Sequence, residues 1–138
     1  MATLVDLSKW LEDLATKIEP LQSEMQELGE AQAVRIQDRT ALGVSVDLQP
    51  FTNYAPATNK PSPVNLRKTG DMLEAVTVES DHTAAHIFFN DPEQAQIAKF
   101  HNDGTQHIPQ RFFFGVSLDD KDKMVGDLRA SIFRRINK

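Results

Sequence analysis

Apolar residues recur at helical spacing along the first thirty positions. Their intervals alternate between four and three residues, which is typical of a helix face that packs against a neighbour. Pro20 interrupts this face because proline lacks a backbone N–H and disfavours helical geometry at the preceding residue. The pattern predicts a short helix over about residues 8–18 and a second that opens at Pro20 and runs to about Arg39. The apolar face, here named the N-terminal seam, consists of Leu7, Leu11, Leu14, Ile18, Leu21, Met25 and Leu28.

Beyond Leu28, the spacing of the seam places the polar residues Gln32 and Arg35 inward. Either the apolar stripe drifts to Ala33, Val34 and Ile36, or the helix leaves its partner. A long coiled coil is therefore disfavoured.

The composition changes abruptly between Gly43 and Pro63, a stretch that holds four of the seven prolines among Asn, Thr and Ser. We expect a long irregular loop. Loops of more than about 12–15 residues are uncommon in compact domains unless they are functional or bind a partner. Phe51 and Tyr54 could anchor this loop either to the chain's own core or to another subunit.

Short elements follow the loop, and their turn residues and alternation set the boundaries. The predicted elements are a helical turn over residues 70–73 capped by Thr69, strands over 75–78 and about 83–89 that form an antiparallel hairpin, a helix from Pro92 to about His101, a strand over 111–116 and an amphipathic helix over 118–137. The last helix has the apolar stripe Met124, Val125, Leu128, Ile132 and Ile136. The sequence therefore predicts one α+β domain, with a small antiparallel sheet flanked by N-terminal helices and a C-terminal amphipathic helix. Its parts are a helical segment (1–42), the loop (43–65) and the sheet with the last helix (66–138).

Three consecutive phenylalanines follow Arg111 in the predicted strand over 111–116. Alternation in a strand sends Phe112 and Phe114 to one face and Phe113 to the other, so a core on one side cannot bury all three. Either both faces are covered within the monomer or one face meets a partner. Because aromatic residues and arginine often anchor interfaces, candidate assembly contacts are Arg111, Phe112, Phe113, Phe51 and Tyr54.

The chain has 138 residues and a net charge of −5, which argues against a generic binder of the nucleic-acid backbone. Residues 1–30 carry seven acids and two lysines, so this segment accounts for the whole excess, and the basic residues Arg134 and Arg135 lie near the other end. This dipolar layout suits either a solvated helix face or head-to-tail contacts between proteins. No stretch approaches the ~18 apolar residues of a membrane span.

The sequence offers little catalytic chemistry. It has no cysteine, which excludes disulfides, thiolate metal sites and cysteine nucleophiles, and its six glycines form no phosphate-binding loop. Asp119 and Asp120 are interpreted as helix-start residues. The four histidines have no metal-binding spacing, so no metal, cofactor or catalytic residue is expected; a small metal-dependent cytoplasmic enzyme built on them is an alternative. These histidines are His82, His86, His101 and His107.

The order of motifs resembles the phage virion-morphogenesis proteins of the tail-completion group over most of the chain. In that family, a leucine-arginine-x-threonine-glycine-x-leucine stretch precedes a hairpin, and an isoleucine-proline-x-arginine-proline-phenylalanine segment precedes an acidic helix start. The residues that match the first motif are Leu66, Arg67, Thr69, Gly70 and Leu73. The residues that match the second are Ile108, Pro109, Arg111, Phe113, Gly115, Ser117 and Asp119, with Phe112 where the family usually has proline.

The resemblance implies a non-enzymatic virion component, made in the host cytoplasm, that forms a ring at the head-proximal end of the tail. Such a ring commonly has six subunits, caps the tail tube and joins it to the head-side neck or connector protein. DNA would pass through the lumen without sequence-specific binding, and Glu12, Glu24 and Glu27 could make that lumen acidic. Two other hypotheses stay open: a head-side neck stopper, and a dimeric helical module built on the N-terminal seam.

Overall fold

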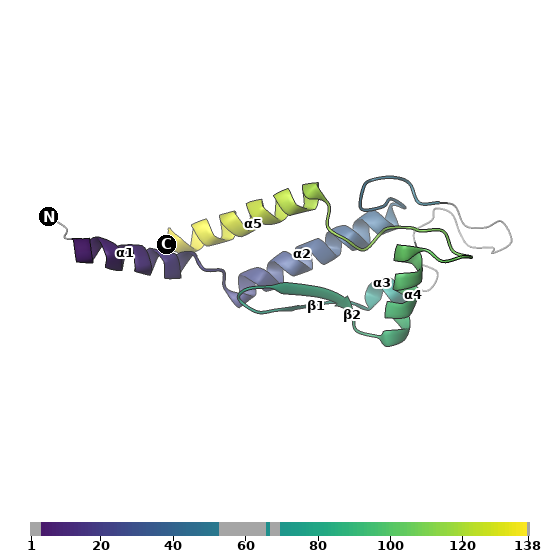
Figure 1. Cartoon of the computed structure of the whole chain (residues 1–138), viewed down its shortest axis with the longest axis horizontal. Helices are drawn as coiled ribbons and strands as arrows, with labels where there is room; N and C mark the ends of the chain where they lie inside the picture. The colour runs from purple at the N-terminus through teal and green to yellow at the C-terminus, as the bar shows by residue number, and fades with distance from the viewer. Residues whose placement is uncertain (1–3, 53–65, 67–69, 138) are drawn as a thin grey trace.

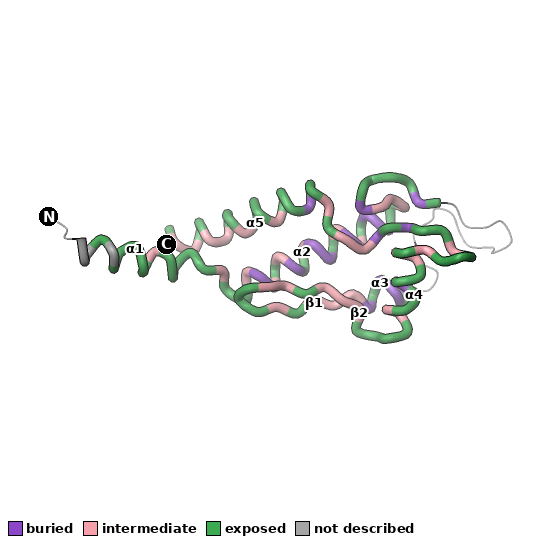
Figure 2. Tube along the Cα trace, in the orientation of Figure 1, coloured by how far each residue is buried: buried purple, intermediate pink, exposed green. Residues whose placement is uncertain are grey.

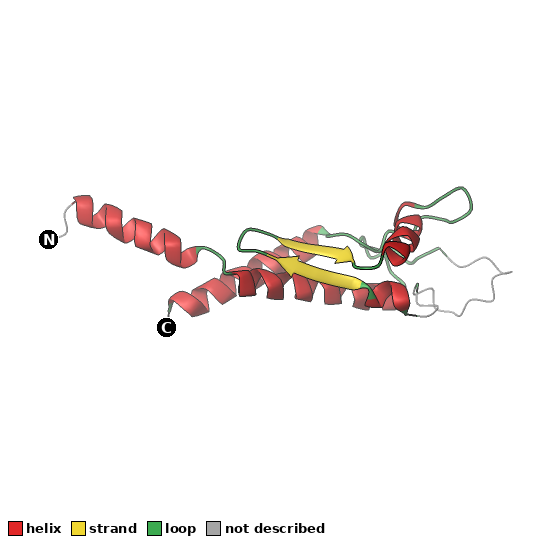
Figure 3. Cartoon of the chain, turned by 90° about the horizontal axis from the view of Figure 1, so that it is seen from below, coloured by secondary structure: helices red, strands yellow, loops and turns green. Residues whose placement is uncertain are grey.

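The structure is a computed structural model that describes residues 4–52, 66 and 70–137. The long helix α2 (Gln22–Ala41) lies in the middle of the molecule (Figure 1). A hairpin of β1 (Val76–Ser80) and β2 (Ala85–Phe89) packs on one side of α2, and helix α5 (Leu118–Ile136) packs on the other. Figure 3 shows the same arrangement from the side of the hairpin. The predicted α+β class is confirmed, with a sheet of two strands in the described part of the chain.

Helix α1 (Leu4–Ile18) begins four residues earlier than predicted and does not flank the sheet. It extends along the long axis of the molecule, past the end of α5 (Figure 1), and packs against α5 near its own C-terminus. Pro20 lies between the two helices rather than at a first helical position. Helix α2 begins at Gln22 because Leu21 takes the N-cap position, where its N–H donates to Glu24 Oε1 (2.9 Å).

The predicted hairpin is confirmed as an antiparallel pair in which Val76 faces Phe89 and Ser80 faces Ala85. Asp81 organises its turn, since Asp81 Oδ1 accepts hydrogen bonds from the Thr83 hydroxyl and from the N–H groups of Thr83 and Ala84. These bonds favour the ionised carboxylate and lower the pKa of Asp81.

Close packing of the hairpin on α2 depends on Gly29, at the middle of that helix. A Cβ atom at this position would lie 2.5 Å from Val78 Cγ1 and 3.1 Å from Ala85 Cβ. Side chains of α2 also bond the backbone of β1: Gln22 Nε2 donates to Ser80 O (3.0 Å) and Gln26 Nε2 to Val78 O (3.2 Å). Helix α2 therefore both covers the hairpin and satisfies some of its carbonyl groups.

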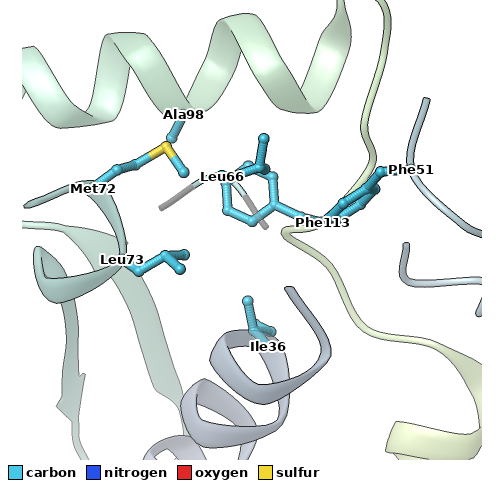
Figure 4. Close-up of a cluster of buried hydrophobic side chains, with 7 residues drawn as sticks. All are labelled: Ile36, Phe51, Leu66, Met72, Leu73, Ala98 and Phe113. Carbon is cyan, nitrogen blue, oxygen red and sulfur yellow. The ribbon is translucent and has the colours of Figure 1, made fainter. Parts of the chain in front are cut away.

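The main hydrophobic core lies at the end of the molecule where α3 (Asp71–Glu74) and α4 (Pro92–Asp103) meet α2. Phe113 lies among the other members of this core (Figure 4) and is 0% exposed. Its ring also contacts those of Phe89 and Phe114, at centroid distances of 6.3 and 6.2 Å. The buried members of the core are Ile36, Phe51, Leu66, Met72, Leu73, Ala98 and Phe113.

The predicted strand over residues 111–116 is wrong, because this segment forms no strand. Its backbone groups bond elsewhere: the Arg111 N–H donates to His101 O (2.7 Å), and Phe112 O accepts from the Val46 N–H (2.8 Å). The Phe114 N–H donates to Asn102 Oδ1 (3.0 Å). With these partners the segment does not alternate, so Phe113 is buried, Phe114 is half-buried and Phe112 stays 36% exposed.

Helix α5 has almost the predicted bounds, and Asp119 and Asp120 lie in its first turn as predicted. Ser117 Oγ accepts from the Asp120 N–H (3.0 Å), and Asp120 Oδ2 accepts from the Ser117 N–H (3.1 Å). The apolar stripe of the helix, however, is not buried. Asp120 is the one fully buried residue of α5.

Burial is concentrated in α2 and at the α3 and α4 end of the molecule (Figure 2). Described residues of α1 and most of α5 are exposed or half-buried. In the described ranges, every helix is too short or too polar to cross a lipid bilayer.

Candidate assembly surface

Helix α1 presents an apolar face to solvent. Trp10 is 58% exposed and Leu11 is 51% exposed, and Leu7 and Ile18 of the same face are exposed to a similar degree. Leu14 is half-buried. Isolated exposed apolar side chains are ordinary, but a contiguous row along one helix is typical of an interaction surface. The N-terminal seam was predicted to pack against a neighbour. In its α1 half, Ile18 packs against α5, while Leu7 and Leu11 remain exposed.

An apolar groove of about 430 Å³ runs along the C-terminal half of α5. We call it the α5 groove. Arg129 is its one polar lining residue, and Phe133 beside it is 64% exposed. The apolar lining consists of Ile18 from α1 and Val125, Leu128, Ile132, Phe133 and Ile136 from α5.

A buried polar network fixes α5 against α2 and so sets the position of the groove. Asp120 Oδ2 accepts hydrogen bonds from Arg39 Nη1 and Gln32 Nε2, both at 3.0 Å. Burial opposes ionisation of the Asp120 carboxyl, but the hydrogen bonds from Gln32, the Ser117 N–H and Arg39 outweigh it and lower its pKa to about 2. Asp120 therefore has a second role besides the predicted helix start.

A second polar contact joins the ends of α1, α2 and α5. Arg135 Nη2 pairs with Glu24 Oε1 at 3.1 Å and also donates to Glu19 O, while Arg135 Nη1 donates to Lys17 O. Burial disfavours the Glu24 carboxylate, yet its bonds to Arg135 and to the Leu21 N–H lower its pKa. The acidic N-terminal segment and the basic C-terminal end thus meet within one chain at this point.

A second exposed apolar cluster lies at the opposite end of α5, beside the first turn of that helix (Figure 1). Leu118 is 79% exposed, and Leu42 and Leu48 are also largely exposed. They line a cleft of about 500 Å³ that also contains Asp38, Asp47, Asp119 and several basic residues. The molecule therefore offers two separate apolar surfaces.

Most of the residues predicted as assembly contacts lie inside the chain. Phe113 and Phe51 are part of the core, and the Arg111 side chain is buried, with Nε donating to Thr52 O (2.9 Å). For the phenylalanine run the sequence left two alternatives, burial within the monomer or contact with a partner. Phe113 is buried within the monomer. Phe112 is the exposed member of the set, and Tyr54 lies outside the described residues, as do Arg67 and Thr69 of the family motif.

The three candidates for an acidic lumen differ in their surroundings. Glu12 and Glu27 are exposed on α1 and α2. The Glu24 carboxylate is mostly covered and bonded to Arg135, so its charge is compensated within the chain. A free acidic surface can therefore include Glu12 and Glu27 but not Glu24.

The four histidines do not form a cluster. His86 lies on β2, His101 on α4, His82 in the hairpin turn and His107 after α4. Across the described ranges, no group of three His, Asp or Glu side chains is placed to hold a metal ion.

The features that sequence reasoning missed are the α5 groove and the Gln32, Arg39 and Asp120 network. The apolar stripe of α5 follows from the sequence, but the spacing alone does not show that it lines a groove. A comparison of the chain with known protein families, curated proteins and solved structures found no match in any of the three.

Proposed function

We propose that this protein is a structural virion component of a tailed phage, a ring subunit that completes the head-proximal end of the tail and joins it to the head. The observation that carries the proposal is the pair of exposed apolar surfaces at opposite ends of a chain that has a separate core of its own. A subunit in a closed ring needs two different surfaces for its two neighbours, and further surface for the structures that the ring joins.

The resemblance to tail-completion proteins supports the same proposal. Leu66 and Leu73, which match the first family motif, are core residues, and Gly70 adopts the left-handed conformation (φ 87°) before α3. In the second motif, Phe113 fills the core and Ser117 caps α5. The matched residues thus have structural roles in this fold, as is expected where a family shares an architecture rather than a catalytic site.

Partners in this proposal are further copies of the chain, the tail tube protein and a head-side connector. The ring commonly found in the resembled family has six subunits, and DNA would pass through its lumen. Glu12 and Glu27 are the described candidates for an acidic lumen surface, because their carboxylates are exposed and make no ion pair in the described part of the chain.

Co-assembly is the direct test. Purified chain is mixed with tails, with filled heads and with both together, all from a phage in which this gene is disrupted, and each mixture is imaged by electron microscopy. We expect a ring at the head-proximal end of the tail and restored head–tail joining. Rings on heads alone would move the protein to the head-side neck, and a chain that binds neither and is absent from virions would overturn the proposal.

A further inference from the structure

We propose that α1 of one copy binds along the α5 groove of a second copy, so that successive subunits join head to tail. The inference deepens the proposed ring function and rests on it for its place in the particle. The contact itself needs no other component of the particle, so it can be tested with the purified chain.

The two surfaces match in periodicity. Leu7, Leu11 and Leu14 follow one another on α1 at intervals of four and three residues, and Val125, Leu128 and Ile132 follow one another on α5 at intervals of three and four. On a helix, residues at these intervals lie on one face. Apolar anchors at such three- and four-residue intervals are the usual way in which a helix binds in a groove.

The chain's own α1 fills only the end of its groove. Ile18 contributes to the groove lining, so a residue of the α1 row already packs there. The rest of α1 leads away along the long axis (Figure 1), which leaves Leu11 exposed on the helix and Val125 exposed in the groove. A second copy of α1 is therefore an occupant with the side chains that the groove accepts.

Charge favours this occupant and this groove. Helix α1 carries three acidic residues against two lysines, and Arg129 is the charged residue that lines the α5 groove. The cleft at the other end of α5 is the less suitable acceptor for an acidic helix, because four aspartates line it against three basic residues. Opposite charges at the rim steer association and fix its register.

The proposed contact joins two different surfaces and is therefore heterologous. When α1 of one copy is bound, that copy's groove and its neighbour's α1 are still open. Such contacts form a closed ring if the rotation between neighbours closes, and an open filament if it does not. This geometry is what a ring subunit requires.

The test uses three variants of the full chain in sedimentation velocity over a wide range of concentrations. Leu11→Glu alters the α1 row, Val125→Glu alters the groove, and Thr16→Glu is the matched control, because it adds the same charge on the opposite face of α1. All three positions are exposed, so thermal unfolding followed by circular dichroism should match the wild-type chain.

We expect Leu11→Glu and Val125→Glu each to weaken self-association at least about tenfold, as for the centre of an interface, while Thr16→Glu behaves as wild type. An equimolar mixture of the first two variants should form a dimer and nothing larger, since one supplies an intact groove and the other an intact α1.

Three results would overturn the inference: a monomeric wild-type chain at every concentration, association that survives Val125→Glu but not Leu11→Glu, or a mixture that stays monomeric. The second would indicate contact between two α1 helices. If the Leu11→Glu and Val125→Glu variants assemble on tails like the wild-type chain, the inferred contact is wrong and the proposed function stands. If the chain self-associates as predicted but binds neither tails nor heads, the contact stands and the proposed function is wrong.

Discussion

Two phenylalanines at opposite ends of the molecule show how differently its two halves are built. Phe113 is enclosed by α2, α4 and the loop that carries Phe51. Phe133 lies on α5 with most of its ring in solvent, beside an equally exposed row on α1. Elements from distant parts of the chain meet around Phe113. The groove beside Phe133 is lined by residues of α1 and α5. Among the described residues, the core end buries its large apolar side chains, whereas the α1 and α5 end leaves many of its own exposed.

The buried network of Gln32, Arg39 and Asp120 lies between these two regions. It ties the beginning of α5 to the second half of α2 through charge and hydrogen bonds rather than apolar packing. Because the carboxylate and the guanidinium are both buried, removing either one would leave the other charge buried without its partner. The pair holds α5 in place although the apolar stripe of that helix is only half-buried.

Replacing Phe113 and Phe133 in turn by alanine should give the largest difference in stability between the two ends of the molecule. Phe113→Ala removes the ring from a closed core, and we expect it to lower the free energy of unfolding by about 4 kcal/mol. Phe133→Ala should change it by less than about 0.5 kcal/mol in dilute protein. Urea unfolding followed by circular dichroism measures both. Similar losses for the two variants would contradict the contrast between the ends.

Asp120→Asn tests the network and should cost about 3 kcal/mol, because it leaves Arg39 buried without its counter-ion. Ser117→Ala removes the cap of α5 alone and should cost only about 1 kcal/mol. Urea unfolding separates the two contributions. If Asp120→Asn and Ser117→Ala lower the free energy of unfolding equally, Asp120 acts as a cap and its ion pair with Arg39 adds no stability.

Acid should weaken the same contact between α2 and α5, with a smaller effect than the Asp120→Asn substitution. The pKa of Asp120 is lowered from 3.8 to about 2, so the unfolded chain takes up this proton first as the pH falls. The ionised carboxylate therefore stabilises the fold above about pH 5, and about 2 kcal/mol is lost between about pH 5 and pH 2. Urea unfolding across this range should show that Asp120→Asn loses correspondingly less than wild type. If stability falls equally with pH in the wild-type chain and in Asp120→Asn, the loss in acid does not come from Asp120.

The elements with local signals were predictable from the sequence. The hairpin, α4 and α5 follow from alternation, from Pro92 at a helix start, and from Asp119 and Asp120 in the first turn of the last helix. The run after Arg111 was predicted wrongly because its strand-like composition is local, whereas its backbone partners, Val46 and Asn102, lie elsewhere in the chain.

The candidate surface was predictable in part. Spacing identified the apolar rows of α1 and α5, but spacing cannot tell a row that the chain buries from one that it leaves exposed. Gln32 was recognised as an inward position, yet its burial depends on Asp120, which is 88 residues away in sequence. Long-range partners of this kind decide whether a polar residue on a helix face is buried.

The central claim is that the α1 and α5 end is completed by a second copy of the chain. Amide hydrogen exchange at several protein concentrations tests it most directly, since it reads both ends in one experiment. We predict that protection of residues 4–18 and of the C-terminal half of α5 rises with concentration, while protection around Leu73 and Ala98 stays constant. Protection of α1 that is the same at every concentration would contradict the account.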